Sequence, residues 1–544
     1  MIEVSDLTIL KDSKVLVDHV DFNIGPGEVL GIVGESGSGK SLTALALIDL
    51  LPPLLKMTSG TKLLFKGNEI TNISGYRGNK VAMIFQEPMN ALNPTMKVVN
   101  QIIEAVLECQ NMTLSKAVAK TEALLKKVSL NTVADIANRY PHQLSGGQKQ
   151  RVMIAIALSR NPDLIIADEA TTALDVTVQK EIIELLKEII KEGNQSVLFI
   201  SHDLKVVRML ADRCLVMRKG KIEEQGTVKD IFSFPKEGYT KALIACRPDL
   251  QKRPKRLASV EDYLTGSYSP EMESTMDRQA RQRNIYSQKP ILELHQIGLS
   301  YPETAKRWMR KTRSNQILQN ITFKLFEGES LGLIGESGCG KTTLGKIIVQ
   351  QINATKGSVF YNKERGIDST KLSDSIQVVF QDPFGSLNPR RSIGEAIKEV
   401  FLTRGTARYK SIDEDKVKNL LVKVGLSAKD YRKYPYEFSG GQRQRIAIAR
   451  ALAAEPKILI CDEAVSALDV SVQAQVLNLL KKLQEEMGLT YLFISHDLSV
   501  VKYFCDRIIV LNKNGEIEEE GESDLLYHYP KSLYTQKLIA AVPQ

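Results

Sequence analysis

The sequence has few cysteines and no long apolar run, and these two absences exclude several classes of protein. Its six cysteines lie far apart and none forms a Cys-x-x-Cys pair, which argues against a zinc site or a disulfide framework. No uncharged apolar stretch approaches the ~18 to 20 residues that a membrane-spanning helix needs. The acidic start, Met1-Ile2-Glu3-Val4-Ser5-Asp6, does not resemble a secretory signal. We therefore expect a protein of the reducing cytoplasm that reaches a membrane only from its surface.

The composition is that of a soluble globular protein, and the length suits two domains. A chain of 544 residues divides naturally into two domains of roughly 250 residues. Apolar residues make up 43% and charged residues 25%, which excludes disorder of the whole chain. The net charge of +9 is spread along the sequence, so it is as compatible with anionic lipid as with nucleic acid. We predict no nucleic-acid partner.

A phosphate-binding pattern occurs twice in the sequence. In such a loop, backbone N–H groups converge on phosphate oxygens, the Lys lies beside the terminal phosphates, and the Ser or Thr hydroxyl binds Mg²⁺. Two copies predict two bound nucleotides. The copies are Gly34-Glu35-Ser36-Gly37-Ser38-Gly39-Lys40-Ser41 and Gly335-Glu336-Ser337-Gly338-Cys339-Gly340-Lys341-Thr342.

Short apolar runs that end in polar groups indicate an α/β fold with sites at the carboxyl ends of buried parallel strands. We expect strands at 29–33, 164–167 and 196–200, their counterparts at 331–334, 458–461 and 491–494, and helices at 181–191 and 474–486. After two strands of each half stand an Asp-Glu pair and a His. The first acid suits the Mg²⁺ shell, the second can deprotonate a water, and the His can donate a hydrogen bond to a γ-phosphate. These residues are Asp168, Glu169 and His202, and Asp462, Glu463 and His496.

A serine-glycine-glycine-glutamine pattern ahead of a helix identifies a family. The two copies are Ser145-Gly146-Gly147-Gln148 and Ser439-Gly440-Gly441-Gln442, and from here on the spacing of the two halves is constant. At this place the pattern is the ABC signature, and the chain resembles the ATP-binding cassette ATPases over nearly its full length. The resemblance implies two domains, each with a RecA-like core, a β-subdomain and a helical signature subdomain. It also implies an intramolecular pseudo-dimer in which each signature closes the nucleotide held by the other domain.

The resemblance implies the residues of two complete sites that bind ATP and Mg²⁺. The catalytic residues would be Glu169 and His202 in site one and Glu463 and His496 in site two. The Mg²⁺ ligands would be Ser41, Gln86 and Asp168 in site one and Thr342, Gln381 and Asp462 in site two. Site one would be closed by residues 439–442 and site two by residues 145–148, with Ala173-Leu174-Asp175 and Ala467-Leu468-Asp469 as D-loops. In the family an aromatic side chain stacks on adenine. Tyr301 fits that place, whereas the first half offers Leu10, so we expect two competent sites of which site one binds ATP less tightly.

The segments around the two glutamines, and the ends of both halves, narrow the resemblance. These segments are similar to the two ATPase subunits of bacterial peptide importers, the oligopeptide and dipeptide group that includes nickel and glutathione systems; here they are fused, as in microcin C-type importers. This implies two transmembrane permease subunits, a solute-binding protein and a peripheral position on the cytoplasmic face of the inner membrane. The segments are 85–94 and 380–390, and the ends are Gly238-Tyr239-Thr240-Lys241-Ala242-Leu243 and Leu533-Tyr534-Thr535-Gln536-Lys537-Leu538.

A further departure from the family pattern and two alternatives complete the hypothesis. Separate importer subunits often carry a cysteine cluster after the first domain, but this chain has only Cys246 there, so we predict no iron–sulfur cluster. We expect domains at 1–246 and 291–544, a linker at 247–290, and a basic insert around Trp308 that is either a solvated loop or a contact with lipid or a partner.

A ribosome-associated ABC-F ATPase is the alternative, although the linker is not a long basic helical arm. A structural-maintenance ATPase is disfavoured because no coiled-coil heptads interrupt either half.

Overall fold

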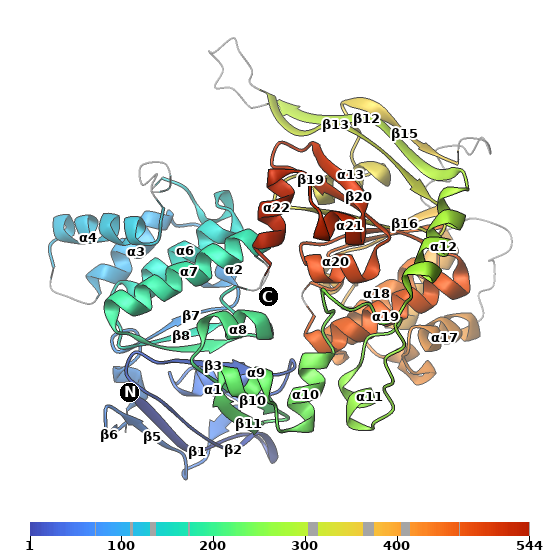
Figure 1. Ribbon diagram of the computed structural model, residues 1–544. Helices are drawn as coiled ribbons and strands as arrows, with labels where there is room; N and C mark the ends of the chain where they lie inside the picture. The colour runs from blue at the N-terminus through green and yellow to red at the C-terminus, as the bar shows by residue number, and fades with distance from the viewer. Residues whose placement is uncertain are drawn as a thin grey trace. The chain divides into compact units, whose positions relative to one another are not determined.

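The computed structural model describes residues 1–70, 72–108, 112–130, 136, 138–171, 174–302, 314–362, 375–403, 414–466 and 468–542. The insert around Trp308, and Ala173 and Ala467 of the expected D-loops, lie outside these residues. The chain divides into two compact units, Met1–Ala245 and Cys246–Val542 (Figure 1). We describe each unit by itself.

The first unit is built on a six-stranded sheet that is parallel except for one edge strand. Its parallel strands are short and almost entirely buried, which explains why they appear in the sequence as continuous apolar runs. Their carboxyl ends meet at one edge of the sheet. In spatial order the strands are β11 (Lys221–Thr227), β10 (Arg213–Arg218), β3 (Val29–Val33), β9 (Ser196–Ile200), β8 (Leu164–Asp168) and β7 (Val81–Ile84), and only β11 is antiparallel to its neighbour.

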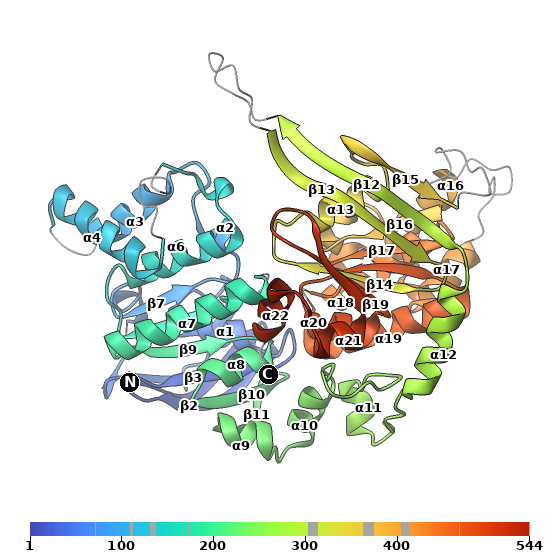
Figure 2. The ribbon, with the colours of Figure 1, turned by 45° about the horizontal axis from the view of Figure 1, so that its top comes forward.

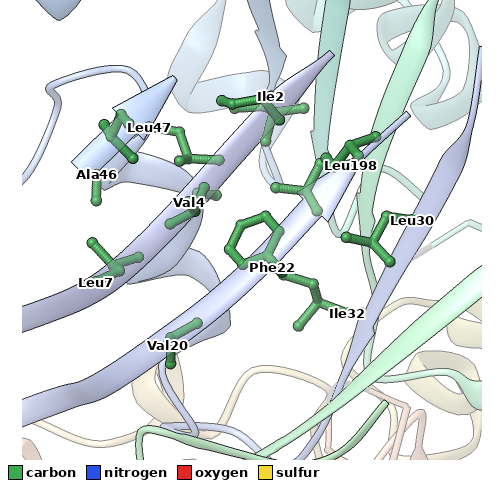
Figure 3. Close-up of a cluster of buried hydrophobic side chains, with 14 of the residues drawn as sticks. Ile2, Val4, Leu7, Val20, Phe22, Leu30, Ile32, Ala46, Leu47 and Leu198 are labelled. Atoms are coloured by element: carbon green, nitrogen blue, oxygen red, sulfur yellow. The ribbon is translucent and has the colours of Figure 1, made fainter. Parts of the chain in front are cut away.

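An antiparallel sheet packs against this parallel one, and the main core of the unit lies between them. Alternate residues of β1 and β2 point into that core, as the strand period requires. Figure 3 shows Val4 and Phe22 facing Leu30, Ile32 and Leu198 of the parallel sheet. The antiparallel strands are β1 (Ile2–Lys11), β2 (Lys14–Ile24), β4 (Leu55–Met57), β5 (Lys62–Phe65) and β6 (Asn68–Glu69).

Helices complete the first unit on the remaining sides. The helices α3, α4 and α6 contact one another and form a helical group away from β1 and β2 (Figures 1 and 2). The helices are α1 (Lys40–Ala46), α2 (Pro88–Ala91), α3 (Val98–Leu107), α4 (Leu114–Lys127), α6 (Gly146–Leu158), α7 (Val176–Gly193), α8 (Leu204–Leu210), α9 (Val228–Ser233) and α10 (Gly238–Ala245).

The second unit repeats this plan. Its six-stranded sheet has the order β16 (Ile376–Val379), β17 (Ile458–Asp462), β18 (Thr490–Ile494), β14 (Ser330–Gly335), β19 (Arg507–Leu511) and β20 (Ile517–Glu522), again with one antiparallel edge strand. The antiparallel sheet consists of β13 (Ser314–Phe326), β12 (Pro290–Pro302) and β15 (Lys356–Tyr361). The predicted α/β class, with two domains that each combine a core, a β layer and a helical group, is confirmed.

The helices of the second unit follow the same order as those of the first. They are α13 (Lys341–Ile348), α15 (Pro383–Ser386), α16 (Ile393–Thr403), α17 (Glu414–Lys423), α18 (Gly440–Leu452), α19 (Val470–Met487), α20 (Leu498–Phe504), α21 (Ser523–His528) and α22 (Leu533–Ala540). Within the part of the chain that the structure describes, no helix is both long enough and apolar enough to cross a membrane.

Residues 247–290, which we expected to be a linker, are folded and belong to the second unit. They contain α11 (Val260–Leu264) and α12 (Thr275–Tyr286). The Arg253 guanidinium is 3.2 Å from both Glu273 and Asp524 and donates hydrogen bonds to the carbonyls of Tyr503 and Cys505. Ion pairs and hydrogen bonds hold this segment, so the fading of apolar periodicity gives no sign of its packing. The domain boundaries themselves stay a prediction.

Candidate nucleotide sites

The phosphate loop of the first unit leaves β3 at Val33 and enters α1 at Lys40. Gly34 has a φ of 151°, and a Cβ there would lie 2.2 Å from the Met217 carbonyl oxygen, so this position requires glycine. The Lys40 ammonium is buried inside the loop and donates to the carbonyl oxygens of Gly34 and Glu35, at 2.8 and 2.9 Å. A loop that curls around a cation in this way is suited to polyphosphate, because the same ammonium can turn to phosphate oxygens.

The loop of the second unit has the same geometry with one chemical difference. Lys341 Nζ donates to the carbonyl oxygens of Gly335 and Glu336, again at 2.8 and 2.9 Å. Cys339 takes the place of Ser38, and its side chain is only 2% exposed. Burial raises the pKa of the Cys339 thiol above its ordinary value, so this sulfur stays protonated and unreactive at neutral pH.

A hydroxyl and a buried carboxyl group meet beside each loop. Ser41 Oγ donates to Asp168 Oδ1 at 3.1 Å, and Thr342 Oγ1 donates to Asp462 Oδ1 at the same distance. Burial at the end of β8 raises the pKa of Asp168 to about 6, and burial also raises the pKa of Asp462. A hydroxyl beside a carboxylate is an oxygen donor set that Mg²⁺ prefers, so these residues fit the expected metal ion.

A glutamate bridges a glutamine and a histidine in each unit. Gln86 Nε2 donates to Glu169 Oε2 at 2.9 Å, and His202 Nδ1 lies 3.1 Å from the same oxygen. Burial tends to lower the pKa of His202, but its hydrogen bond to Glu169 and the charge of that carboxylate outweigh burial and raise it. The three side chains therefore form a connected group across the ends of β7, β8 and β9.

The second unit repeats this group. Gln381 Nε2 donates to Glu463 Oε2 at 2.7 Å, and His496 Nδ1 lies 3.4 Å from Glu463 Oε1. Both glutamates have left-handed backbone, with φ of 48° for Glu169 and 51° for Glu463. This turn follows the last residue of β8 or β17 directly.

The signature residues cap long helices. Ser145 Oγ accepts the Gln148 N–H at 3.3 Å while Gln148 Oε1 accepts the Ser145 N–H at 3.1 Å, which closes a capping box at the start of α6. Ser439 and Gln442 form the same box on α18. The expected contact of each signature with the nucleotide of the other domain stays a prediction.

The two glycines of each signature have different surroundings. A Cβ on Gly147 would lie 2.4 Å from Val178 Cγ1, and one on Gly441 would lie 2.1 Å from Val472 Cγ1. The second glycine thus allows the signature helix to pack on the next helix. Gly146 and Gly440 are exposed, and a Cβ on Gly440 would meet no atom within 4 Å, so the first glycine leaves the helix start open to an approaching ligand.

The proposed adenine contact differs between the units, as the sequence indicates. Tyr301 is 46% exposed near the end of β12, and Leu10 is half-buried near the end of β1. In the described part of the D-loops, Asp175 and Asp469 cap α7 and α19 by accepting N–H groups of the first helical turn.

Sequence reasoning missed one side chain in each site. The Glu35 N–H, in the phosphate loop, donates to Tyr239 Oη of α10 at 3.3 Å, and the Glu336 N–H donates to Tyr534 Oη of α22 at 3.4 Å. The signal was the recurrence of Tyr-Thr-x-x-Leu-Ile-Ala at the end of both halves, which carried no indication of a contact with the loop.

Comparison with known proteins assigns the family. A family described as ABC transporter matches residues 17–172 and 318–466, and one described as oligopeptide/dipeptide transporter, C-terminal region, matches residues 224–266. The chain is 41% identical to the glutathione import ATP-binding protein GsiA of Escherichia coli (strain K12), over 100% of this chain and 89% of the relative. It is 42% identical to GsiA of Salmonella paratyphi A, over 97% of this chain and 86% of the relative.

Solved structures that match over most of the chain share the fold. A model of ribosome-bound archaeal Pelota and ABCE1 matches with a TM-score of 0.62 at 21% identity, covering 95% of this chain and 79% of that one. The archaeal ribosome recycling factor aABCE1 in complex with the stalk protein aP1 matches with a TM-score of 0.58 at 22% identity, covering 91% and 85%. At such identities the likeness shows the fold alone. The family matches and the full-length relatives show that this chain belongs to the ABC transporter family and carries two ABC ATPase domains in one polypeptide.

Proposed function

We propose that this chain is the ATP-hydrolysing subunit of an importer of peptides or related small solutes such as glutathione. The observation that carries the proposal is the duplicated cluster of lysine, hydroxyl, aspartate, glutamate, histidine and glutamine at the carboxyl ends of four strands in each unit. The match of residues 224–266 to an oligopeptide/dipeptide transporter region supports the substrate class. The identity to GsiA over the whole chain supports the role in import.

At site one, the proposed reaction is attack of water on the γ-phosphorus of ATP. The water oxygen forms a bond to phosphorus, the bond from phosphorus to the bridging oxygen breaks, and ADP leaves with that electron pair. Glu169 accepts the proton of the attacking water, and His202 donates a hydrogen bond to the γ-phosphate. Ser41, Gln86 and Asp168 would hold Mg²⁺, which when bound would neutralise phosphate charge.

Site two uses the corresponding residues. Lys341 would lie beside the terminal phosphates, and Thr342, Gln381 and Asp462 would hold the metal. Glu463 accepts the proton of the water and His496 donates to the γ-phosphate. The close agreement of the hydrogen bonds in the two units supports two sites that both hydrolyse ATP.

We further propose that each nucleotide is closed by the signature of the other domain. Ser439 to Gln442 would complete site one, and Ser145 to Gln148 would complete site two, in an intramolecular pseudo-dimer. The exposed starts of α6 and α18 support this role, because a helix N-terminus offers N–H groups to phosphate. ATP then closes the two domains, and closure drives two transmembrane permeases on the cytoplasmic face of the inner membrane, which receive cargo from a solute-binding protein.

The test of this function begins with the protein's partners. Purification from its own cells in mild detergent should recover two permeases, and reconstitution of that complex should show ATPase activity that a peptide-loaded binding protein stimulates. Recovery of 70S ribosomes in place of permeases would overturn the proposal and favour an ABC-F function.

The symmetry of the two sites has a separate test. Glu169→Gln and Glu463→Gln should each lower ATP turnover strongly, since loss of a general base lowers rates by about 10² to 10⁴ at the affected site. Glu188→Gln, at an exposed position of α7, is the matched control. Unchanged turnover in Glu169→Gln together with complete loss in Glu463→Gln would show that only site two is competent.

A further inference from the structure

The last helix of each unit is tied to the phosphate loop by a tyrosine hydroxyl. Tyr239 is 2% exposed, and its Oη accepts the Glu35 N–H at 3.3 Å. In the second unit, Tyr534 Oη accepts the Glu336 N–H at 3.4 Å. The same contact occurs in both units, and the two helices share the pattern Tyr-Thr-x-x-Leu-Ile-Ala, so the contact repeats as a feature of the site.

Each of these helices is also anchored at its start to the edge strand of the parallel sheet. Glu224 of β11 accepts the N–H groups of Lys236 and Glu237, at 2.8 and 3.2 Å, just before α10. Before α22, Glu519 of β20 accepts those of Lys531 and Ser532, at 2.9 and 3.1 Å. The helix therefore joins the edge strand to the phosphate loop.

A cation lies near this contact in each unit, but it has a different partner in the two units. The Arg218 guanidinium, at the end of β10, lies 4.8 Å from the centroid of the Tyr239 ring. Lys513, which follows β19, forms an ion pair with the Glu336 carboxylate at 2.8 Å. Arg218 ends β10 and Lys513 follows β19. These two strands carry the carbonyl oxygens of Met217 and Leu511, which lie against the first glycine of each phosphate loop.

We propose that Tyr239 and Tyr534 are positioning residues that hold the phosphate loops in the conformation that binds ATP. Each hydroxyl fixes the peptide N–H of the second loop residue, and that residue's carbonyl accepts the ammonium of Lys40 or Lys341. When the ammonium turns to phosphate, it gives up this carbonyl. The tyrosine hydroxyl then still restrains the start of the loop. Without that hydroxyl, the empty loop has more conformational entropy, and ATP binding must remove this extra entropy.

This inference rests on the proposed binding of ATP at both loops. Isothermal titration calorimetry with ATP and Mg²⁺, in a Glu169→Gln/Glu463→Gln background that does not hydrolyse ATP, measures two dissociation constants. Adding Tyr239→Phe should weaken one site, and adding Tyr534→Phe the other, by about fivefold each, the effect of one net hydrogen bond between neutral groups. Tyr491→Phe, which removes a buried hydroxyl bonded to a helix carbonyl far from the loop in sequence, should leave both sites unchanged.

The outcomes separate the two proposals. A background protein that binds fewer than two ATP contradicts the proposed function. If each site binds ATP as tightly after the tyrosine substitutions as before them, the positioning role is wrong. A loss of affinity that Tyr491→Phe reproduces would also overturn it. Without nucleotide, the unfolding temperature should fall by no more in Tyr239→Phe and Tyr534→Phe than in Tyr491→Phe, which also loses one hydrogen bond of a tyrosine hydroxyl. A larger fall would indicate a role in overall stability.

Discussion

Substitution of Gly441 by alanine should destabilise the second unit through its contact with α19. The added methyl carbon would lie 2.1 Å from Val472 Cγ1, far inside the usual contact distance of two carbons, and α18 and α19 would have to move apart. Gly440 is the matched control, because an added methyl group there meets no atom within 4 Å. The two variants change the same helical turn by the same group.

The magnitude follows from two opposing effects. Overpacking of a well-packed contact costs about 1 to 3 kcal/mol, while alanine in place of glycine favours the helix by up to about 1 kcal/mol. Gly441→Ala should therefore lower the free energy of unfolding by about 1 to 2 kcal/mol, which lowers the melting temperature by roughly 2 to 8 °C for a unit of this size. Gly440→Ala should leave the melting temperature unchanged or raise it slightly.

Differential scanning calorimetry of the full chain without nucleotide provides the measurement. Adding Val472→Ala to Gly441→Ala removes the clashing methyl groups and should restore part of the lost stability, a coupling that a double-mutant cycle isolates. Gly147→Ala should behave like Gly441→Ala, since its Cβ would lie 2.4 Å from Val178 Cγ1. Equal melting temperatures for the Gly440 and Gly441 variants would refute the packing argument.

Three further predictions concern charge, metal and redox chemistry. Burial, with the charges of neighbouring arginines, lowers the pKa of Lys481 to about 7, so the folded state binds fewer protons than the unfolded state above pH 7 and its stability rises towards pH 10. Lys481→Met should raise the melting temperature at pH 6 and lose that advantage at pH 9, unlike the exposed neighbour Lys482→Met. Ser41→Ala and Thr342→Ala should each raise the Mg²⁺ concentration required for half-maximal ATPase activity, and unchanged requirements would remove the hydroxyls from the metal site. Protein purified without oxygen should show no iron-dependent visible absorbance, and such a band would place a cluster near Cys246.

The strands that carry the candidate site residues could be predicted from the sequence, because each strand lies directly before those residues in the chain. The apolar runs 29–33 and 196–200 match β3 and β9 residue for residue, and each stands directly before its polar group. A parallel strand buried on both faces is recognised by composition alone. The helix expected at 181–191 is longer, Val176–Gly193, because Asp175 caps it before the apolar pattern begins.

Contacts between distant parts of the chain could not be predicted in this way. Tyr239 meets a phosphate loop that is 204 residues earlier, and no periodicity joins the two. The packing of the segment 247–290 could not be predicted either, because Arg253 and Arg278 hold it to the rest of the second unit through the carboxylates of Asp524 and Glu522 and through backbone carbonyls. Charged residues in a Pro- and Ser-containing stretch indicate a solvated linker until their partners are known.

The left-handed backbone at Glu169 and Glu463 sets the stability of the chain against the chemistry proposed for these two side chains. A glutamate in this conformation costs roughly 1 to 2 kcal/mol relative to glycine, which adopts it freely. Replacement by glycine would relieve that backbone cost, and under the proposed mechanism it would also remove the carboxylate that accepts the proton of water. A screen of variants for heat resistance alone would therefore favour loss of both glutamates, whereas a screen for ATP turnover would keep them.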